Sequence, residues 1–253
     1  MRLQNKVAVI TGAGSGMGRA TSVLFAREGA KVVVADINDR GGAETVDQIR
    51  SAGGDAFYVH TDVSRAADVK NLVDTAVKKY GKLDIMYNNA GHPGKNTPIE
   101  DTEEGLFDLV YGVNVKGILW GAKYAVPVMK KQGYGVILNT ASVSGDRPRP
   151  GMLVYASSKG AAILLTKGLA VELAPFKIRV NCINPVAAET PMLKEFAPKN
   201  VSEDELRQKF TATVPIGRLA TADDVAYAAL YLCSDEASIV TGAVLHVDGG
   251  RNV

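Results

Sequence analysis

Short apolar segments alternate with longer amphipathic segments along the whole 253-residue chain. Each apolar segment is apolar nearly throughout, as a strand covered on both faces of a sheet should be. Strands are expected at 6–11, 31–36, 56–60, 83–88, 135–141, 178–184 and 243–247, and helices near 16–28, 40–52, 65–80, 103–132, 153–174 and 221–233. This alternation predicts right-handed βαβ units and an α/β fold, namely a doubly wound Rossmann fold with a seven-stranded, mostly parallel sheet and helices on both faces.

The chain carries no internal linker rich in glycine, serine or proline, so residues 1–253 are expected to form a single domain. One region interrupts the alternation, because prolines and charged residues crowd the stretch from Pro185 to Pro215. Within it, Ser202 and Glu205 have the spacing of a capping box, which predicts the start of a short helix. A long excursion between a late strand and the next helix suits a lid over a ligand, and we place this lid at about 186–214.

Composition excludes several classes of function. The net charge is +2 and the basic residues are scattered, so nothing indicates binding to nucleic acid or to an anionic membrane. No segment approaches the roughly 18 apolar residues of a membrane span, and the run 7–10 is too short for a signal peptide, so a cytoplasmic protein is expected. Cys182 and Cys233 are far apart and the three histidines lack metal-ligand spacing, so no metal site is expected.

A glycine-rich turn, Thr11–Gly18, joins the first strand directly to the first helix. Glycine permits a tight turn and close backbone approach, and the new helix offers its free N–H groups and positive dipole end to a pyrophosphate. The position at the first strand–helix junction favours this interpretation over a merely flexible turn. We therefore assign to cofactor binding the residues Gly12, Ser15, Gly16, Met17 and Gly18. The chain has neither a P-loop nor a nucleophile elbow, which argues against a nucleotide triphosphatase and an α/β-hydrolase.

Asp36 ends the second strand, and an acid at this place can hydrogen-bond the adenosine ribose hydroxyls and repel a 2′-phosphate. The next residue is Ile37 rather than arginine or lysine, so NAD is favoured over NADP. The alternative is that Asp36 belongs to a turn or caps the next helix, for which Asp39 is a competing candidate.

Two further strand ends carry candidate cofactor contacts. Asp62 and Val63 follow the third strand, where the Asp62 carboxylate can reach the adenine amino group. The alternative, nearly as well supported, is that Asp62 is an acid at the start of a helix near Ser64. The fourth strand closes with the segment 88–91. Its asparagine amides can tie neighbouring strand ends together, and its glycine lets the backbone run beside the cofactor, so we assign Asn89, Ala90 and Gly91 to cofactor binding against the alternative of a plain turn.

Tyr155 and Lys159 are four residues apart at the start of an amphipathic helix and therefore share one face. The ordinary pKa of tyrosine, about 10, is too high for a base at neutral pH. A nearby ammonium favours the phenolate, so we expect Lys159 to lower the pKa of Tyr155, and a nicotinamide cation would add to this effect. Tyr155 could then exchange a proton with a carbonyl or alcohol oxygen. On its own, this spacing is common on helix surfaces.

Ser142 follows the fifth strand at the sheet edge where ligands bind in doubly wound folds, and its hydroxyl can hold a substrate oxygen. Ser144 and Thr140 are local competitors for this role. Asn114 lies in the expected helix 103–132, where asparagine is mildly unfavourable. It is therefore expected to have a polar task such as holding a water, with a solvent-facing asparagine as the alternative.

Together these motifs resemble those of the short-chain dehydrogenase/reductase family in its short, single-domain form, over essentially the whole chain. The matching segments are Thr11–Gly18, Asp62-Val63, Asn88–Gly91, Asn114–Gly117, Ser142, Tyr155–Lys159, Asn184-Pro185 and Val247–Gly250. The resemblance implies that Ser142 polarises the substrate oxygen, Tyr155 transfers the proton, and Lys159 binds the nicotinamide ribose and lowers the tyrosine pKa. It also implies that Asn114 holds a water linking Lys159 to solvent, that Asp36 selects NAD, and that the protein is a homotetramer.

The chain departs from the family pattern at one place beside the expected nicotinamide. The family usually has Asn-Pro-Gly with a threonine four residues further on, whereas here Val186 replaces the glycine after Pro185, and Thr190 keeps its place. Backbone contacts of these three residues to the carboxamide are expected to survive. The valine side chain is expected to narrow the pocket.

The expected substrate pocket is largely apolar, which suits a hydrophobic or alicyclic secondary alcohol or ketone. Its expected lining is His92, Pro93, Gly94, Ser144, Met152, Val186, Met192 and Leu193. Arg147 or Arg149, in the loop before Tyr155, could meet an acidic group of a substrate or a carrier protein, although a solvated or subunit-interface loop is the more ordinary interpretation.

These features predict an NAD(H)-dependent oxidoreductase that interconverts a secondary alcohol and a ketone by hydride transfer. The first alternative is reduction of a 3-oxoacyl thioester, against which Asp36 weighs because biosynthetic reduction usually draws on NADPH. A sugar dehydrogenase is a weaker alternative. A non-enzymatic NAD-binding scaffold is disfavoured by the intact set of Asn114, Ser142, Tyr155 and Lys159.

Overall fold

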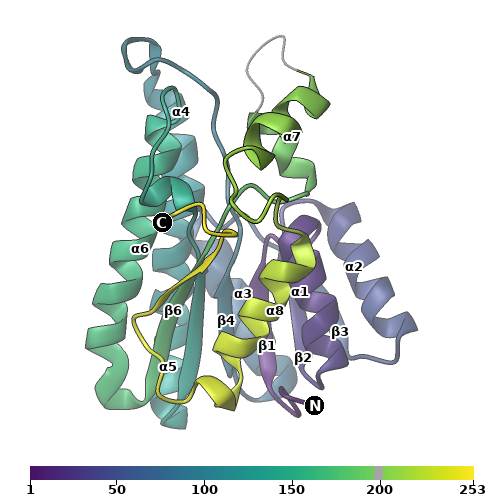
Figure 1. Ribbon diagram of the computed structural model, residues 1–253. Helices are drawn as coiled ribbons and strands as arrows, with labels where there is room; N and C mark the ends of the chain where they lie inside the picture. Colours follow the sequence, from purple (N-terminus) through teal and green to yellow (C-terminus); the bar gives the residue numbers. More distant parts are fainter. Residues whose placement is uncertain (197–201) are drawn as a thin grey trace.

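The computed structural model describes residues 1–196 and 202–253. Its seven strands form one sheet in the order β3-β2-β1-β4-β5-β6-β7, and every neighbouring pair is parallel. The strands are β1 (Val7–Thr11), β2 (Lys31–Asp36), β3 (Ala56–His60), β4 (Ile85–Asn88), β5 (Gly135–Thr140), β6 (Ile178–Pro185) and β7 (Val244–Val247). This confirms the doubly wound α/β fold, with the strand order reversing between β1 and β4 (Figure 1).

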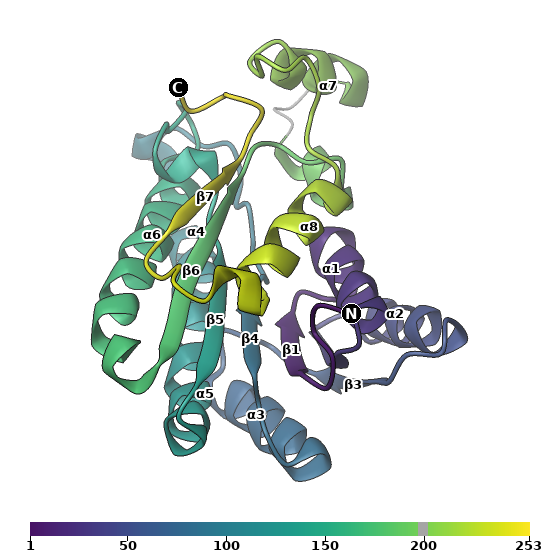
Figure 2. The ribbon, with the colours of Figure 1, turned by 60° about the horizontal axis from the view of Figure 1, so that its bottom comes forward.

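Helices cover both faces of the sheet. The α-helices are α1 (Gly16–Arg27), α2 (Asp39–Ser51), α3 (Ala66–Tyr80), α4 (Glu104–Tyr111), α5 (Gly117–Gln132), α6 (Leu153–Leu173), α7 (Glu203–Thr211) and α8 (Ala222–Cys233). Helices α1, α2 and α8 pack on one face, and α3, α5 and α6 pack on the other (Figure 2). The sheet is therefore buried on both sides, which explains why its strands are apolar nearly throughout.

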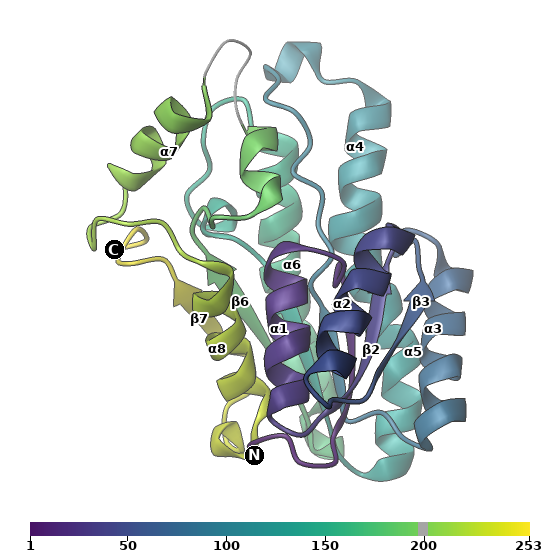
Figure 3. The same cartoon turned by 90° about the vertical axis from the view of Figure 1, so that its right-hand side faces the viewer.

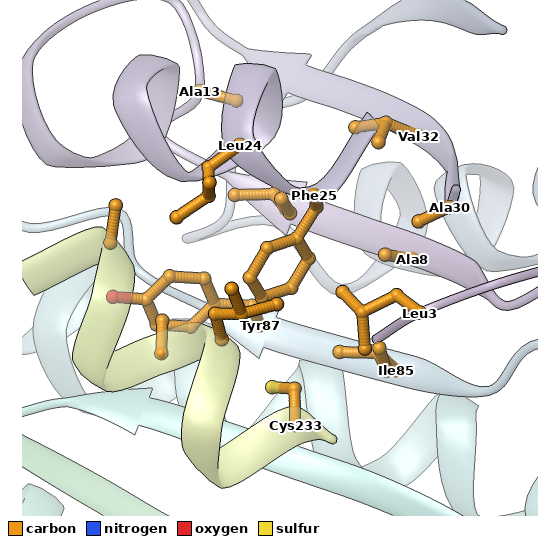
Figure 4. Packing of buried hydrophobic residues seen from close by; sticks show 14 of the residues in the cluster. Leu3, Ala8, Ala13, Leu24, Phe25, Ala30, Val32, Ile85, Tyr87 and Cys233 are labelled. Carbon is orange, nitrogen blue, oxygen red and sulfur yellow. The ribbon is translucent and has the colours of Figure 1, made fainter. Parts of the chain in front are cut away.

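Successive strand residues point to opposite faces, so each strand contributes to two hydrophobic clusters. In β1, Ala8 and Ile10 join the cluster under α1 and α8, whereas Val9 joins the cluster under α3 and α5. Figure 4 shows the first cluster, in which Phe25 of α1 and Tyr87 of β4 lie together. Both side chains are fully buried. This packing holds the carboxyl ends of the strands in place, and those ends carry the candidate site.

The helix expected at 103–132 is divided in the structure. Helix α4 ends at Tyr111, a π-helical turn η2 (Gly112–Lys116) follows, and α5 begins at Gly117. A π turn inserts an extra residue into the helical ladder and often occurs at functional sites. The other expected strand and helix bounds agree with the structure to within two residues.

The segment between β6 and α8 rises above the carboxyl edge of the sheet. It contains the 3₁₀ segment η5 (Pro191–Phe196) and α7, which Figure 3 shows on the opposite side of that edge from α4. The capping box at Ser202 and Glu205 is confirmed. Of the expected lid 186–214, residues 197–201 lie outside the described part of the chain. No helix in the described part is long and apolar enough to span a membrane.

Candidate active site

The glycine turn between β1 and α1 is shaped by close backbone contacts. A Cβ atom on Gly18 would lie 2.1 Å from the carbonyl oxygen of Gly12, and Gly12 itself has a φ of +63°. Both positions therefore require glycine. The side chain of Ser15, which precedes α1, forms no capping hydrogen bond. The first-turn N–H groups of α1 thus remain available to an anionic ligand such as a pyrophosphate.

The Asp36 carboxylate faces this turn. Its Oδ2 accepts a hydrogen bond from the Gly14 N–H at 2.7 Å, and its Oδ1 accepts one from the Asn38 N–H at 2.9 Å. Asp36 therefore does belong to a turn, since the Asn38 N–H lies two residues further on. The helix-capping part of the alternative was wrong for both acids, because Asn38 caps α2 by accepting a hydrogen bond from the Gly41 N–H. Asp39 is the first residue of the helix and accepts the Tyr58 hydroxyl at 2.8 Å. The Asp36 carboxylate, held by these two N–H groups, lines the cleft above the glycine turn.

A cavity of about 370 Å³ runs along the glycine turn to Asp36 and the end of β3. It is lined by most of the expected cofactor residues, namely Gly12, Ser15, Gly16, Met17, Gly18, Asp36, Ile37, Asp62, Val63, Asn89, Ala90, Gly91 and Thr190. None of the described residues that line it is lysine or arginine. The cavity fits the adenosine and pyrophosphate part of a dinucleotide. Its glycine floor and the N-terminus of α1 suit the pyrophosphate, and the Asp36 carboxylate at its far end suits the ribose of the adenosine.

Polar side chains tie the strand ends together around this cleft. The Asn88 amide donates to Asn139 Oδ1 at 2.9 Å, and the Asn89 amide donates to the Thr11 carbonyl at 2.9 Å. Asp62 accepts hydrogen bonds from the backbone and hydroxyl of Ser64, as an acid at a helix start does, while it also lines the cavity. Asp62 therefore both forms the hydrogen bonds of an acid at a helix start and lines the cavity in which a cofactor contact was expected.

Tyr155 and Lys159 lie in the first turns of α6, and both are buried. The Lys159 ammonium donates to the Thr140 carbonyl at 2.8 Å and lies 5.7 Å from the centre of the Tyr155 ring. Ser142 follows β5, and its hydroxyl accepts a hydrogen bond from the Ser144 N–H at 3.2 Å. The Thr140 hydroxyl is bound to Tyr87 and therefore does not compete with Ser142.

The protonation of this pair differs from the expectation that Lys159 lowers the pKa of Tyr155. Burial raises the pKa of Tyr155 to about 12, and a hydrogen bond with Ser142 opposes this rise only in part. Burial also lowers the pKa of Lys159 to about 8, because a buried ammonium loses its hydration. Burial therefore disfavours charge on both side chains, but at neutral pH Lys159 still carries its proton and Tyr155 is neutral.

Asn114 lies on the π-helical turn η2, and its side chain is 1% exposed. The alternative of a solvent-facing asparagine was therefore wrong. Its Oδ1 accepts the His92 N–H at 2.8 Å, and its amide donates to the His92 carbonyl at 3.0 Å and to Ser158 Oγ at 2.9 Å. Asn114 thus connects the loop after β4 to α6 directly behind the pair Tyr155 and Lys159.

A second cavity of about 250 Å³ adjoins the first at the carboxyl edge of β5 and β6. It is lined by Tyr155, Lys159, Ser142, Pro185 and by the expected substrate residues Ser144, Met152, Val186, Met192 and Leu193. The two cavities share Met17, Asn89, Gly91, Thr190 and Met192, so one ligand could extend through both. A nicotinamide ribose at this junction would lie beside Lys159 and Tyr155.

Three residues expected in the substrate pocket, namely His92, Pro93 and Gly94, do not line the second cavity, and Pro93 does not line the first one either. His92 lines the first cavity, because Asn114 holds its backbone on that side. Gly94 lines neither cavity, and a Cβ atom there would lie 3.1 Å from Val110. No sequence pattern pointed to Phe196, Lys209 and Phe210, which line the second cavity from the segment between β6 and α8. Their places depend on how the lid folds over the sheet.

Known proteins resemble this chain over nearly its whole length. A family model described as enoyl-(acyl carrier protein) reductase matches residues 12–252. The 4-formylbenzenesulfonate dehydrogenase of Comamonas testosteroni is 43% identical over 253 residues, which are 100% of this chain and 100% of that protein. These matches cover the glycine turn, both cavities and the lid.

Two solved structures extend the comparison to three dimensions. A 3-ketoacyl-(acyl-carrier-protein) reductase from Brucella melitensis, complexed with NADH, is 44% identical with a TM-score of 0.92 over 99% of this chain and 100% of that one. A 7α-hydroxysteroid dehydrogenase, complexed with NADH and 7-oxo glycochenodeoxycholic acid, is 40% identical with a TM-score of 0.92 over 98% and 95% of the two chains. This chain therefore belongs to the short-chain dehydrogenase/reductase family of oxidoreductases.

Proposed function

We propose that the protein interconverts a secondary alcohol and a ketone with NAD(H), and that Tyr155 acts as the general acid and base. One observation carries this proposal. Tyr155, Ser142 and Lys159 meet in a mostly apolar cavity that opens into a glycine-floored cleft ending at Asp36. A substrate oxygen and a dinucleotide would therefore come together at the Tyr155 hydroxyl.

The residues divide the chemistry as follows. A nicotinamide cofactor in the adjoining cleft would supply the hydride to the ketone carbon, or accept it from the alcohol. Ser142 holds the substrate oxygen by a hydrogen bond. Tyr155, whose pKa is raised to about 12, keeps its proton at neutral pH and donates it to that oxygen as the ketone is reduced. In the reverse direction the phenolate takes the alcohol proton, and the positive charge of Lys159 stabilises that phenolate.

We further propose that NAD is preferred over NADP. The Asp36 carboxylate stands where the adenosine ribose would lie, and no lysine or arginine among the described lining residues could bind a 2′-phosphate. The two solved relatives described above were both complexed with NADH, which is consistent with this preference.

The proposed substrate is a compound with an apolar, ring-bearing body. The cavity walls are formed by Val143, Met152, Val186, Leu193 and Phe196, which favour an apolar ligand. By their names, relatives of this chain act on formylbenzenesulfonate and on a hydroxysteroid, both of which are ring compounds. Reduction of a 3-oxoacyl thioester is the second candidate, supported by the description of the Brucella relative.

We also propose that the protein assembles as a homotetramer. Apolar side chains of the two long helices α5 and α6 are exposed in the single chain, including Leu119 at 41%, Leu164 at 72% and Val171 at 80%. Apolar residues so exposed along adjacent helices are typical of an interface with another protein. Light scattering on the purified protein tests this assembly.

Replacement of Tyr155 by phenylalanine tests the catalytic proposal. We expect Tyr155→Phe to lower turnover by about 10²- to 10⁴-fold, the usual contribution of a general acid, while NADH binding followed by fluorescence persists. Turnover is measured at the NADH absorbance band with a panel of ketones and secondary alcohols. Tyr111→Phe is the matched control, because the Tyr111 hydroxyl donates to Ser157 outside the cavity. Near-normal rates of Tyr155→Phe would contradict the proposed mechanism.

A further inference from the structure

Arg149 is a cation inside the substrate cavity that has no anionic partner among the residues that the structure describes. It lies in the loop before α6 and lines the same cavity as Tyr155. Its guanidinium carbon stacks 4.3 Å from the centre of the Phe210 ring of α7. Its guanidinium forms no hydrogen bond or ion pair with any other residue that the structure describes, whereas its backbone carbonyl accepts the Met152 N–H. Burial and the nearby positive charge of Arg251 both lower the pKa of Arg149, so its surroundings disfavour a cation that lacks a counter-ion.

The contact with Phe210 uses the face of the aromatic ring, and no described residue accepts a hydrogen bond from the guanidinium N–H groups. A guanidinium lying flat on an aromatic ring keeps its N–H donors in its own plane, where they can bind a carboxylate or sulfonate through two parallel hydrogen bonds. Phe210 thereby supplies a cation–π contact that holds the guanidinium at this wall of the cavity. Lys209 lines the cavity as well, so the end formed by α7 is positively charged while the remaining walls are mostly apolar.

The cation and the reacting phenol are at separate places along the cavity. The Tyr155 ring contacts the Phe196 ring edge-on at 5.4 Å, and Phe196 contacts Phe210 edge-on at 6.5 Å. Arg149 lies beyond Phe210 in this series of contacts. Tyr155 and Arg149 therefore lie at the two ends of a row of contacts formed by two aromatic side chains that line the cavity. An apolar body packed against these rings would have its reacting oxygen at one end of the row and its anionic group at the other.

We propose that Arg149 binds the carboxylate or sulfonate of a substrate whose reacting carbonyl or alcohol lies at the opposite end of an apolar, ring-bearing body. This inference rests on the proposed function, because Tyr155 defines the reacting end. Arg147 does not share the role, since it is exposed and its guanidinium donates to the carbonyls of Arg251 and Val253.

Matched pairs of ketones test the inference in the 253-residue protein with NADH. The pairs are 4-acetylbenzoate with 4-acetylbenzamide, 4-acetylbenzenesulfonate with its sulfonamide, and 4-oxocyclohexanecarboxylate with its amide, and acetophenone and cyclohexanone serve as unsubstituted references. We expect kcat/KM to favour the anionic member of a pair by about 10- to 100-fold, the usual strength of a hydrogen-bonded charge pair. The Arg149→Gln variant should abolish most of this ratio, chiefly through KM. Arg147→Gln, the control, removes the same charge two positions away and should keep the ratio.

The outcomes separate this inference from the proposed function. Turnover of neutral and anionic members at equal kcat/KM, or an unchanged ratio in Arg149→Gln, overturns the role of Arg149 and leaves the proposed function standing. If Arg149→Gln alters the oligomeric state on gel filtration and leaves the ratio intact, the arginine belongs to a subunit interface and the inference is again overturned. If the protein binds NADH and reduces none of the ketones, the proposed function fails, and the inference fails with it.

Discussion

The charge of Asp36 is expected to decide the choice between NAD and NADP, and its contribution can be estimated from the structure. The carboxylate is fixed by the Gly14 and Asn38 N–H groups at the far end of the cofactor cleft. A 2′-phosphate bound there would place like charges about 4 Å apart, which costs about 1 kcal/mol per charge pair in water and about 4 kcal/mol at a protein surface. The expected discrimination against NADP is therefore about 5-fold to 1,000-fold in kcat/KM.

Asp36→Asn is the sharpest test, because asparagine keeps the shape and an oxygen that can accept the Gly14 N–H while it removes the charge. We expect the ratio of kcat/KM for NADP to that for NAD to rise by about 5-fold to 1,000-fold, measured with one ketone and both reduced cofactors. Asp39→Asn is the control, since this exposed carboxylate three residues further on binds Tyr58 and His60 and does not line the cleft. An unmodified enzyme that prefers NADPH, or equal ratios in the two variants, would refute the reasoning.

Three further substitutions test other parts of the site. Burial lowers the pKa of Lys159 from 10.5 to about 8, so between pH 8 and pH 10.5 the unfolded chain binds more protons than the folded one. The free energy of unfolding of the unmodified protein, relative to that of Lys159→Met, should therefore rise by at most about 1.4 kcal/mol per pH unit in this range. Urea titrations at pH 7 and pH 10 measure this, and an equal difference at both values contradicts it. Gly121→Ala would bring a Cβ atom to 2.0 Å from Asn88 Oδ1, so the protein should lose about 1–3 kcal/mol, whereas Gly105→Ala, with no atom in reach, should not lower Tm. Asn114→Ala removes three hydrogen bonds of a buried side chain and should lower both Tm and kcat, with a loss of about 1–3 kcal/mol of stability. Unchanged thermal unfolding would contradict this.

Most of the fold could be predicted from the sequence because its causes are local. A parallel strand covered on both faces must be apolar throughout, and in β1 every residue is buried. The glycine turn could also be predicted, because positions such as Gly18 have no room for a side chain and therefore require glycine in the sequence. The π-helical turn at Asn114 was not predicted, because an extra residue in a helix leaves the apolar pattern nearly unchanged. Its cause is tertiary, namely the hydrogen bonds from Asn114 to the loop after β4 and to Ser158.

The position of Arg149 illustrates a second limit of local reasoning. The sequence left open whether Arg147 or Arg149 meets an acidic group, because two arginines two positions apart look alike. In the structure they differ because of Phe210, which lies on α7 and is brought over the cavity by the lid. The partner that distinguishes the two arginines therefore comes from a distant part of the chain.

The same lid explains why the protonation of Tyr155 could not be predicted from spacing. Four-residue spacing correctly places Lys159 near Tyr155, and a Coulombic argument then predicts a lower phenol pKa. That argument assumes that solvent hydrates both groups, whereas Phe196 packs against the Tyr155 ring and both side chains are buried. Desolvation opposes charge on each of them, so it raises the pKa of Tyr155 to about 12 and lowers that of Lys159 to about 8. The residues that line the second cavity therefore also keep the proton on Tyr155, which is the state that the proposed reduction of a ketone requires.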